Sequence, residues 1–157
     1  MREILFRGQT RKKGQKVWMD GTPVDGEWVY GGVLQGVGDF SIIYGGNHQN
    51  DPGEDLQKWG VYTDTLGQFT GLTDKNGKKV FEGDILKFTD VKYEYEWIGR
   101  VEFGNPNEEY NWGFQLVYIK GEKPNTDILC WFDMEEAGAF AEVIGNIHDN
   151  PELLENP

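Results

Sequence analysis

Residues 68–88 read QFTGLTDKNGKKVFEGDILKF, and this stretch decides the fold. Strand-forming residues on both sides of Asn76-Gly77 predict a hairpin, because β-branched and aromatic residues favour strands and Asn-Gly favours tight turns. Both turn residues tolerate positive φ, so we expect a type I′ turn. Glu82-Gly83-Asp84 interrupts the pattern before residues 85–88 resume it. The stretch therefore predicts three closely spaced strands, and it contains no catalytic group of residues.

The rest of the chain supports a mainly β protein. Further strands are predicted at 4–6, 27–34, 40–44, 99–103, 114–119, 128–132 and 143–147. Their close spacing predicts a small antiparallel, SH3-like or barrel-like C-terminal half (67–157), with N-terminal β-hairpins (1–66) packed on it. Short helical turns are expected near the C-terminus. One follows the capping-box spacing at 133–136 and runs through 137–141, and another begins at Asn150-Pro151 with Asn150 as the N-cap.

Charge and cysteine content limit the class of function. The 157 residues carry a net charge of −12, and residues 67–157 hold eight basic and eighteen acidic side chains. A nucleic-acid-binding protein is expected to have a basic face, so this composition does not favour nucleic acid as a partner. The chain has no apolar run of membrane-spanning length, and its single cysteine cannot form an internal disulfide. We therefore expect no membrane contact and a cytoplasmic location.

No set of residues predicts a catalytic or metal site, and no cofactor is expected. His48 lies in the polar loop 45–55, and His148 precedes an aspartate far along the chain. A zinc site needs three or four converging ligands, and these histidines with Cys130 do not have that spacing. The acidic pairs 108–109 and 135–136 are typical of a solvated surface. We therefore expect the protein not to be an enzyme.

Lysines at the tip of the central hairpin form one candidate for phosphate contact. Lys75, Lys78 and Lys79 lie beside the turn, and residues 11–16 form a second basic segment. Such lysines are also common where a turn only needs to be soluble. Asp84 follows a glycine, so we expect its carboxylate to accept a hydrogen bond from its own turn and not to serve in catalysis.

Aromatic residues form the better candidate for an interaction surface. Tyr93, Tyr95 and Trp97 alternate with glutamates, which predicts an edge strand with the three rings on one face. Tyr110 and Trp112 lie in a polar loop. Tyrosine and tryptophan are over-represented among the residues that dominate protein interfaces. An exposed edge strand at 93–97 also favours self-association, so we expect a homo-oligomer.

Three segments give the chain a resemblance to the YopX family of phage and prophage proteins from Gram-positive bacteria. They are MREILFR at 1–7, the central stretch at 68–88, and EVIGNIHDNPELL at 142–154; GEWVYG at 26–31 adds to them. The resemblance implies a mostly β protein, encoded on a mobile element, in the cytoplasm of a bacterial host cell. It implies no established activity and supplies no catalytic or binding residues.

These observations favour a phage or prophage accessory protein that binds an unidentified host or phage protein without catalysing a reaction. Two alternatives stay open: a nucleic-acid-binding module that uses the basic hairpin tip, and an acidic DNA mimic that inhibits a host enzyme.

Overall fold

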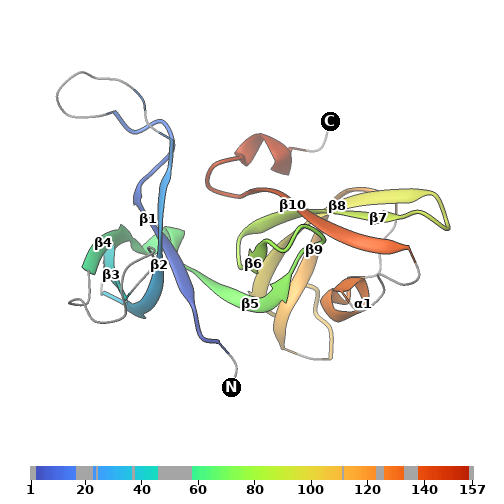
Figure 1. Cartoon of the computed structure of the whole chain (residues 1–157), viewed down its shortest axis with the longest axis horizontal. Coiled ribbons are helices and arrows are strands. Elements are labelled where there is room, and N and C mark those ends of the chain that lie inside the picture. The colour runs from blue at the N-terminus through green and yellow to red at the C-terminus, as the bar shows by residue number, and fades with distance from the viewer. Residues whose placement is uncertain are drawn as a thin grey trace. The chain divides into compact units, whose positions relative to one another are not determined.

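The structure is a computed structural model that describes residues 3–16, 23, 25–36, 38–45, 58–110, 112–122, 126–132 and 138–155. The chain divides into two compact units, Met1–Phe69 and Thr70–Pro157. Figure 1 shows the elements of each unit, and strand β5 (Gly67–Thr73) carries the chain from the first unit into the second.

The first unit is an antiparallel sheet with the strand order β4-β3-β2-β1, followed by the first part of β5. Its elements are β1 (Phe6–Arg11), β2 (Glu27–Leu34), β3 (Phe40–Tyr44), β4 (Lys58–Tyr62) and the 3₁₀ turn η1 (Thr63–Thr65). Val29, Ile43 and Val61 form its buried core. Gly8 of β1 lies so close to β4 that an added Cβ would be 2.9 Å from Val61 Cγ2. The sheet is therefore folded over its own core.

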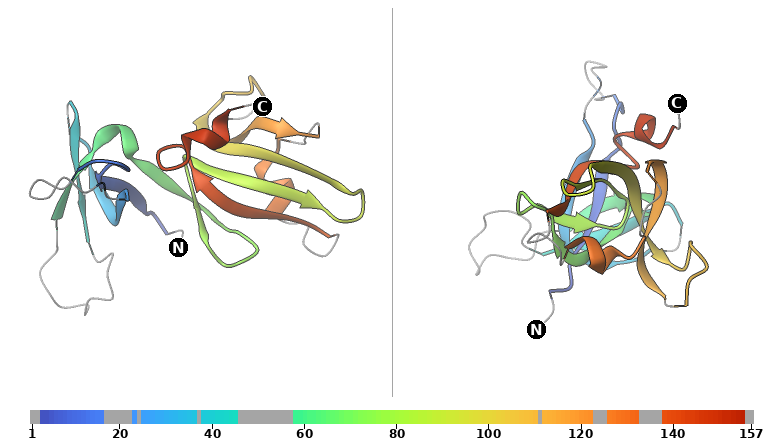
Figure 2. Two further views of the ribbon diagram at one scale, coloured as in Figure 1. Left: turned by 90° about the horizontal axis from the view of Figure 1, so that it is seen from above. Right: turned by 90° about the vertical axis from the view of Figure 1, so that its right-hand side faces the viewer.

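The second unit is built on a four-stranded antiparallel sheet with the order β10-β7-β8-β9. Figure 2 shows the long paired strands of this sheet. The elements are β6 (Lys79–Phe81), β7 (Asp84–Asp90), β8 (Tyr95–Gly104), β9 (Gly113–Gly121), the helix α1 (Ile128–Phe132), β10 (Ala139–Asn146) and the 3₁₀ turn η3 (Pro151–Leu154). Within the described residues the sheet stays open and does not close into a barrel.

Aromatic residues form the centre of the second core. Phe88 of β7 stacks on Trp97 of β8 with ring centroids 4.2 Å apart. Trp131 of α1 packs against both rings, at 5.2 Å from Phe88 and 5.8 Å from Trp97. Such packing buries a large apolar area, so α1 is held against the sheet by its tryptophan.

The predicted mainly β fold is confirmed, and the strands predicted at 27–34 and 40–44 coincide with β2 and β3. The short helical turn predicted at Asn150-Pro151 is η3. Asn150 occupies the N-cap position, but its side chain does not cap the turn; its Oδ1 accepts a hydrogen bond from Asn146 N instead (3.2 Å).

The predictions for residues 128–141 were wrong in two places. Residues 128–132, predicted as a strand, form α1, and the Asp127 carboxylate accepts a hydrogen bond from Leu129 N at its start (3.0 Å). Residues 139–141, predicted as helical, begin β10. Residues 133–137, including the predicted capping box, lie outside the described residues, as do 17–19 and 46–57.

The predicted edge strand at 93–97 was also wrong. Residues 91–94 form the turn between β7 and β8, where Asp90 Oδ1 accepts a hydrogen bond from Tyr93 N (3.1 Å) and Glu94 has a φ of 55°. β8 starts at Tyr95 and pairs with β7 on one side and β9 on the other. An interior strand has no free edge, so this segment does not provide a site for sheet extension.

The Asn76-Gly77 turn forms where it was expected, but it is not type I′. Only Gly77 has a positive φ (78°), and Gly77 N donates to Asp74 O (3.0 Å). The Asp74 carboxylate accepts hydrogen bonds from Asn76 N and Lys78 N, both at 2.9 Å. An aspartate that binds the backbone two residues ahead favours this type of turn over the mirror-image one.

Candidate functional site

Between β8 and β9 of the second unit, the structure describes residues 105–110 and 112, and hydrogen bonds hold the first part of this loop in place. Asn105 and Glu109 form a reciprocal pair, in which Asn105 Nδ2 donates to Glu109 O and Glu109 N donates to Asn105 Oδ1, each at 2.8 Å. Gln115 Nε2 also donates to Asn105 Oδ1 (2.9 Å), and Asn107 Nδ2 donates to Leu116 O (2.9 Å). The loop is therefore anchored to β9 by its own side chains.

This anchored loop presents large aromatic side chains to solvent. Tyr110 is 99% exposed and Trp112 is 78% exposed. Phe103 is 55% exposed and packs edge-on against Phe114, its partner on β9, at 5.1 Å. Leu129 of α1 is 57% exposed. We call these five residues the aromatic surface; exposed apolar groups gathered in this way are typical of interaction sites.

A cavity of about 230 Å³ opens within the aromatic surface. Trp112, Phe114 and Leu129 contribute apolar walls, and Glu109 and Asp127 contribute carboxylates. Thr126 Oγ1 donates to Glu109 Oε1 (2.7 Å), which ties the segment before α1 to the loop. The described lining residues include no lysine or arginine, so the cavity combines apolar walls with negative charge.

The structure separates the aromatic residues that the sequence grouped together. Tyr93 lies in the β7–β8 turn, 67% exposed, with the Lys92 ammonium 5.2 Å from its ring centroid. Tyr95 is half-buried against Trp131, and Trp97 is 1% exposed in the core. Of the five candidate residues, Tyr110 and Trp112 remain together on an exposed surface.

Sequence reasoning missed Phe103, Phe114 and Leu129 as members of this surface. The sequence assigns Phe103 and Phe114 only to strands, and it places Leu129 on a predicted strand. The pairing of the two phenylalanines was detectable, because they flank one polar loop and therefore oppose each other in a hairpin. Leu129 reaches the surface only because 128–132 is a helix.

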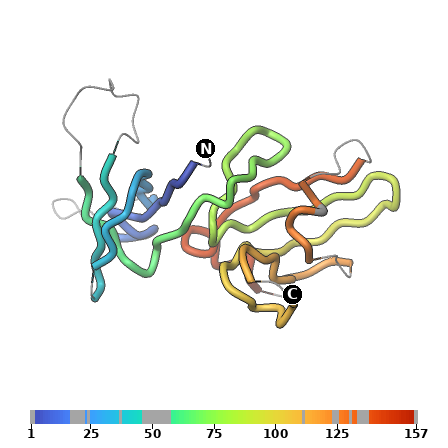
Figure 3. The backbone as a smooth tube through the Cα atoms, turned by 90° about the horizontal axis from the view of Figure 1, so that it is seen from below, coloured from blue at the N-terminus to red at the C-terminus, as the bar shows by residue number. Residues whose placement is uncertain are grey.

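The basic hairpin tip is partly used within the protein. Lys75 Nζ lies 3.5 Å from Glu142 Oε2 and 4.3 Å from the centroid of the Phe140 ring. Its backbone N donates to Ala141 O (3.1 Å), so the turn, green in Figure 3, is fastened to β10. Lys78 and Lys79 are exposed. The charge of Lys75 is therefore offset by a carboxylate.

The Asp84 carboxylate accepts a hydrogen bond within its own turn, as the sequence predicts. Its side chain is buried, with 1% of the residue exposed, and Asp84 Oδ2 accepts a hydrogen bond from Phe81 N (2.8 Å). Gly83, with a φ of 91°, completes the turn between β6 and β7.

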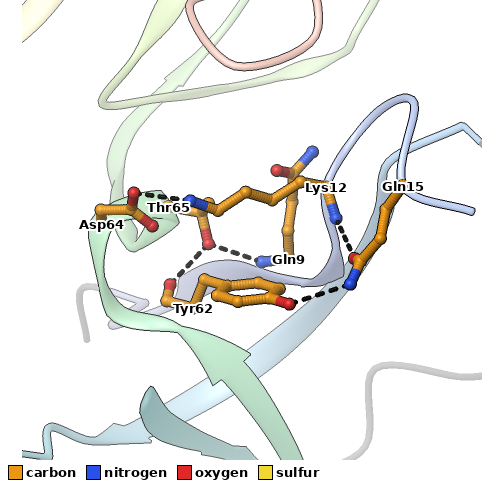
Figure 4. Close-up of polar contacts among 6 residues, drawn as sticks. All are labelled: Gln9, Lys12, Gln15, Tyr62, Asp64 and Thr65. Atoms are coloured by element: carbon orange, nitrogen blue, oxygen red, sulfur yellow. Dashed lines mark hydrogen bonds and ion pairs between the residues drawn. The ribbon is translucent and has the colours of Figure 1, made fainter. Parts of the chain in front are cut away.

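A second cavity, of about 420 Å³, lies in the first unit beside β4. Figure 4 shows Lys12 extending across the Tyr62 ring to Asp64, with 2.7 Å between Lys12 Nζ and Asp64 Oδ2. Gln15 Nε2 donates to the Tyr62 hydroxyl (3.0 Å). In the basic segment 11–16, Lys12 is thus paired with a carboxylate within its own unit.

Among the described residues, no three histidine, cysteine or acidic side chains are placed to hold a metal ion. His148 N donates to Asn146 Oδ1 (3.0 Å) in the turn after β10. His48, the acidic pair 135–136 and the side chain of Cys130 lie outside the described part of the chain. The helices in the described part are all too short or too polar to cross a membrane.

The chain belongs to the YopX family, because a family model described as "YopX protein" matches residues 25–155. No curated protein matches the chain. The chain is also similar to protein EF1440 from Enterococcus faecalis, known from a crystal structure, with 21% identity and a TM-score of 0.46. That match covers 99% of this chain and 100% of EF1440.

Proposed function

We propose that this YopX-family protein is a non-enzymatic accessory protein of a phage or prophage, which acts in the host cytoplasm by binding another protein. The aromatic surface is the docking site, and the partner is a host or phage protein that presents a basic segment. The observation that carries the proposal is the exposure of Tyr110 and Trp112 on a loop that side-chain hydrogen bonds already hold in place.

The anchored loop favours binding for an entropic reason. Ordering a flexible loop on binding reduces affinity, whereas a loop fixed beforehand avoids that cost. Asn105, Asn107 and Gln115 hold this loop to β9 without using Tyr110 or Trp112. Exposed tyrosine and tryptophan side chains contribute most of the affinity in many protein interfaces.

The charge of the surroundings favours a basic partner. Glu109 and Asp127 line the cavity, and the second unit contains most of the acidic excess of a chain with net charge −12. Complementary charge accelerates the encounter, and an arginine or lysine of the partner is also attracted to the face of a tryptophan such as Trp112.

The test is affinity capture from infected host lysate with the wild-type protein and the double variant Tyr110→Ala/Trp112→Ala. We expect the double variant to lose the partner, with affinity reduced at least about thirtyfold, because loss of an interface hot spot costs ~2 kcal/mol or more. The matched control is Tyr93→Ala, which removes an exposed tyrosine of the same unit and should leave capture unchanged.

Salt and nuclease treatment separate this proposal from its alternatives. Partner capture should weaken, but persist, as salt rises, since screening removes only the electrostatic part. A bound protein that is retained equally by the double variant would contradict the aromatic docking site. Capture of nucleic acid alone, lost on nuclease treatment, would replace the proposal with a nucleic-acid-binding function.

A further inference from the structure

The cavity of the aromatic surface has the size of a site for one side chain. Its volume is about 230 Å³, whereas pockets for drug-sized molecules range from roughly 300 to 1,000 Å³. Trp112, Phe114 and Leu129 supply apolar walls, and Glu109 and Asp127 supply carboxylates. The cavity therefore suits a single side chain of a partner protein better than a whole small molecule.

Hydrogen bonds hold both carboxylates at the cavity. Glu109 Oε1 accepts a hydrogen bond from the Thr126 hydroxyl (2.7 Å), and the backbone of Glu109 is bonded twice to Asn105. Asp127 Oδ1 accepts a hydrogen bond from Leu129 N (3.0 Å). An ionised carboxylate has about four lone-pair positions and donates no hydrogen bond. Both groups are thus placed to accept further hydrogen bonds from a cation that enters the cavity.

Trp112 provides an aromatic ring beside these carboxylates. A Cβ added to Gly104 would be 3.9 Å from Trp112 Cζ3, so the indole lies next to the end of β8, yet the residue is 78% exposed. A cation over an aromatic face is attracted by the ring quadrupole, most strongly at tryptophan. A cationic side chain would therefore meet an aromatic ring and two carboxylates in one cavity.

Apolar groups and metal ions fit this cavity less well. An apolar side chain would displace water from Glu109 and Asp127 without replacing its hydrogen bonds, which is costly. A metal ion such as Ca²⁺ takes six to eight oxygen ligands. In the part of the chain that the structure describes, no three histidine, cysteine or acidic side chains are grouped to hold one.

The charge around the cavity also favours a cation. Residues 105–129 carry four acidic and two basic side chains. Of these two, Lys120 lies at the end of β9 remote from the cavity, and Lys123 lies outside the described residues. On β8, Arg100 already donates to Glu102 (3.1 Å). A phosphate or an acidic side chain is therefore repelled, whereas a cationic one is attracted.

Among cationic side chains, arginine suits the cavity better than lysine. A guanidinium is planar and has five N–H donors, enough to bind two carboxylates at once, whereas an ammonium is a compact point charge. It also stacks on aromatic rings and is more weakly hydrated, so it loses less when apolar walls replace water. Arginine is, in addition, enriched among the residues that dominate protein interfaces.

We propose that the cavity takes one arginine side chain of the partner protein. Its guanidinium stacks on Trp112 and is bound by the carboxylates of Glu109 and Asp127. This assignment rests on the proposed function, because the arginine belongs to the partner that docks on the aromatic surface.

The experiment is a titration of the full chain with three acetylated and amidated tripeptides, which have glycine at both ends and arginine, lysine or citrulline in the middle. The readout is the indole N–H signal of Trp112 in ¹⁵N NMR spectra, identified by its loss in Trp112→Ala. The arginine peptide should shift this signal saturably, with a dissociation constant at least about fivefold lower than that of the lysine peptide.

Citrulline keeps the shape of arginine without its charge, so its peptide should give no saturable shift. Equal binding of the arginine and lysine peptides, or of the arginine and citrulline peptides, would overturn the proposal. So would the absence of any saturable shift with the arginine peptide.

Two double variants test the carboxylates. Glu109→Gln/Asp127→Asn removes both charges but keeps the oxygens that already accept hydrogen bonds. It should weaken binding of the arginine peptide at least about tenfold, because charge-assisted hydrogen bonds are much stronger than neutral ones. The matched control, Glu108→Gln/Glu122→Gln, removes the same charge from exposed residues that do not line the cavity. It should change binding by less than about twofold at physiological salt, which screens exposed charges. Circular dichroism checks that each variant keeps its fold.

Failure of the arginine site can be distinguished from failure of the proposed function. A captured partner that needs Tyr110 and Trp112, but binds Glu109→Gln/Asp127→Asn as well as the wild-type protein, would overturn the arginine site alone. Conversely, specific binding of the arginine peptide by a protein that captures no partner would overturn the proposed function alone.

Discussion

At the scale of single residues, two aspartates of the stretch 68–88 form its turns. Asp74, 5% exposed, accepts backbone hydrogen bonds from Asn76 and Lys78 through Oδ1 and from Val143 through Oδ2 (2.9 Å). Asp84 accepts one from Phe81. Both carboxylates are thus engaged by backbone donors. The hydrogen bond from Val143 N to Asp74 Oδ2 also joins the hairpin to β10, because Val143 lies on that strand, 69 residues after Asp74.

Replacing Asp74 with alanine should destabilise the second unit by about 2 kcal/mol, because backbone donors lose a shared acceptor. Urea denaturation followed by tryptophan fluorescence measures the change. The control is Asp64→Ala, which breaks an exposed ion pair with Lys12 and should change stability by about 0.5 kcal/mol or less. Equal effects of the two substitutions would show that the Asp74 contacts are not important for folding.

Replacing either of two glycines with alanine should change the stability of the protein by different amounts. A Cβ on Gly99 would lie 2.5 Å from Trp97 Cζ3 and 3.0 Å from Val117 O, whereas Gly60 has open space. Gly99→Ala should therefore cost about 1–3 kcal/mol, as overpacking does in a tight core. Gly60→Ala should be neutral or slightly stabilising because alanine reduces the freedom of the unfolded chain. A stable Gly99→Ala protein would contradict the close contact at Trp97.

At the scale of elements, α1 shows how tertiary contacts determine whether a short apolar segment becomes a strand or a helix. Residues 128–132 read ILCWF, and their apolar and aromatic residues predict a strand. In the structure, Ile128 and Trp131 are buried and Leu129 is exposed. Residues three apart lie on one side of a helix, so the helix lets both buried residues reach the same core. Periodicity alone cannot distinguish a strand from a helix over five residues.

Trp131→Ala should destabilise the second unit by about 3–5 kcal/mol, since it removes a large buried aromatic side chain. Leu129→Ala, on the exposed side of the same helix, should change stability by about 0.5 kcal/mol or less. Thermal unfolding measures both. Leu129→Ala should nevertheless weaken binding of the proposed partner, because Leu129 belongs to the aromatic surface. If both variants unfold alike, α1 does not pack on the sheet through Trp131.

At the scale of the whole molecule, each unit has its own buried cluster. Val29, Ile43 and Val61 form the cluster of the first unit, whereas the cluster around Phe88 and Trp97 belongs to the second. The two clusters share no residue, so each unit has the core that a compact domain needs.

A core substitution in one unit should therefore loosen that unit alone. Ile43→Ala is expected to cost about 2–5 kcal/mol and to raise amide hydrogen exchange throughout the strands β1 to β4. Exchange in residues 70–157 should stay as in the wild-type protein. Trp131→Ala provides the reciprocal experiment. Simultaneous loss of protection in both units after either substitution would show that the chain unfolds as one cooperative body.

The sequence by itself determined the mainly β class, the position of the central hairpin, the strands at 27–34 and 40–44, and the membership of the YopX family. These features rest on local signals, such as strand-forming residues beside Asn-Gly and Glu-Gly-Asp, or on a motif that spans much of the chain. The Tyr110–Trp112 candidate was also accessible, because aromatic residues stand out in a polar loop. Residue order alone is enough for such inferences.

Only the tertiary structure decided which aromatic residues form a surface. Tyr93, Tyr95 and Trp97 look equivalent in the sequence, yet a turn fixed by Asp90 leaves Tyr93 in solvent while the core covers Trp97. Leu129 joins Trp112 through the folding of α1. Burial depends on contacts between residues far apart in the chain, and local propensity carries no information about those contacts.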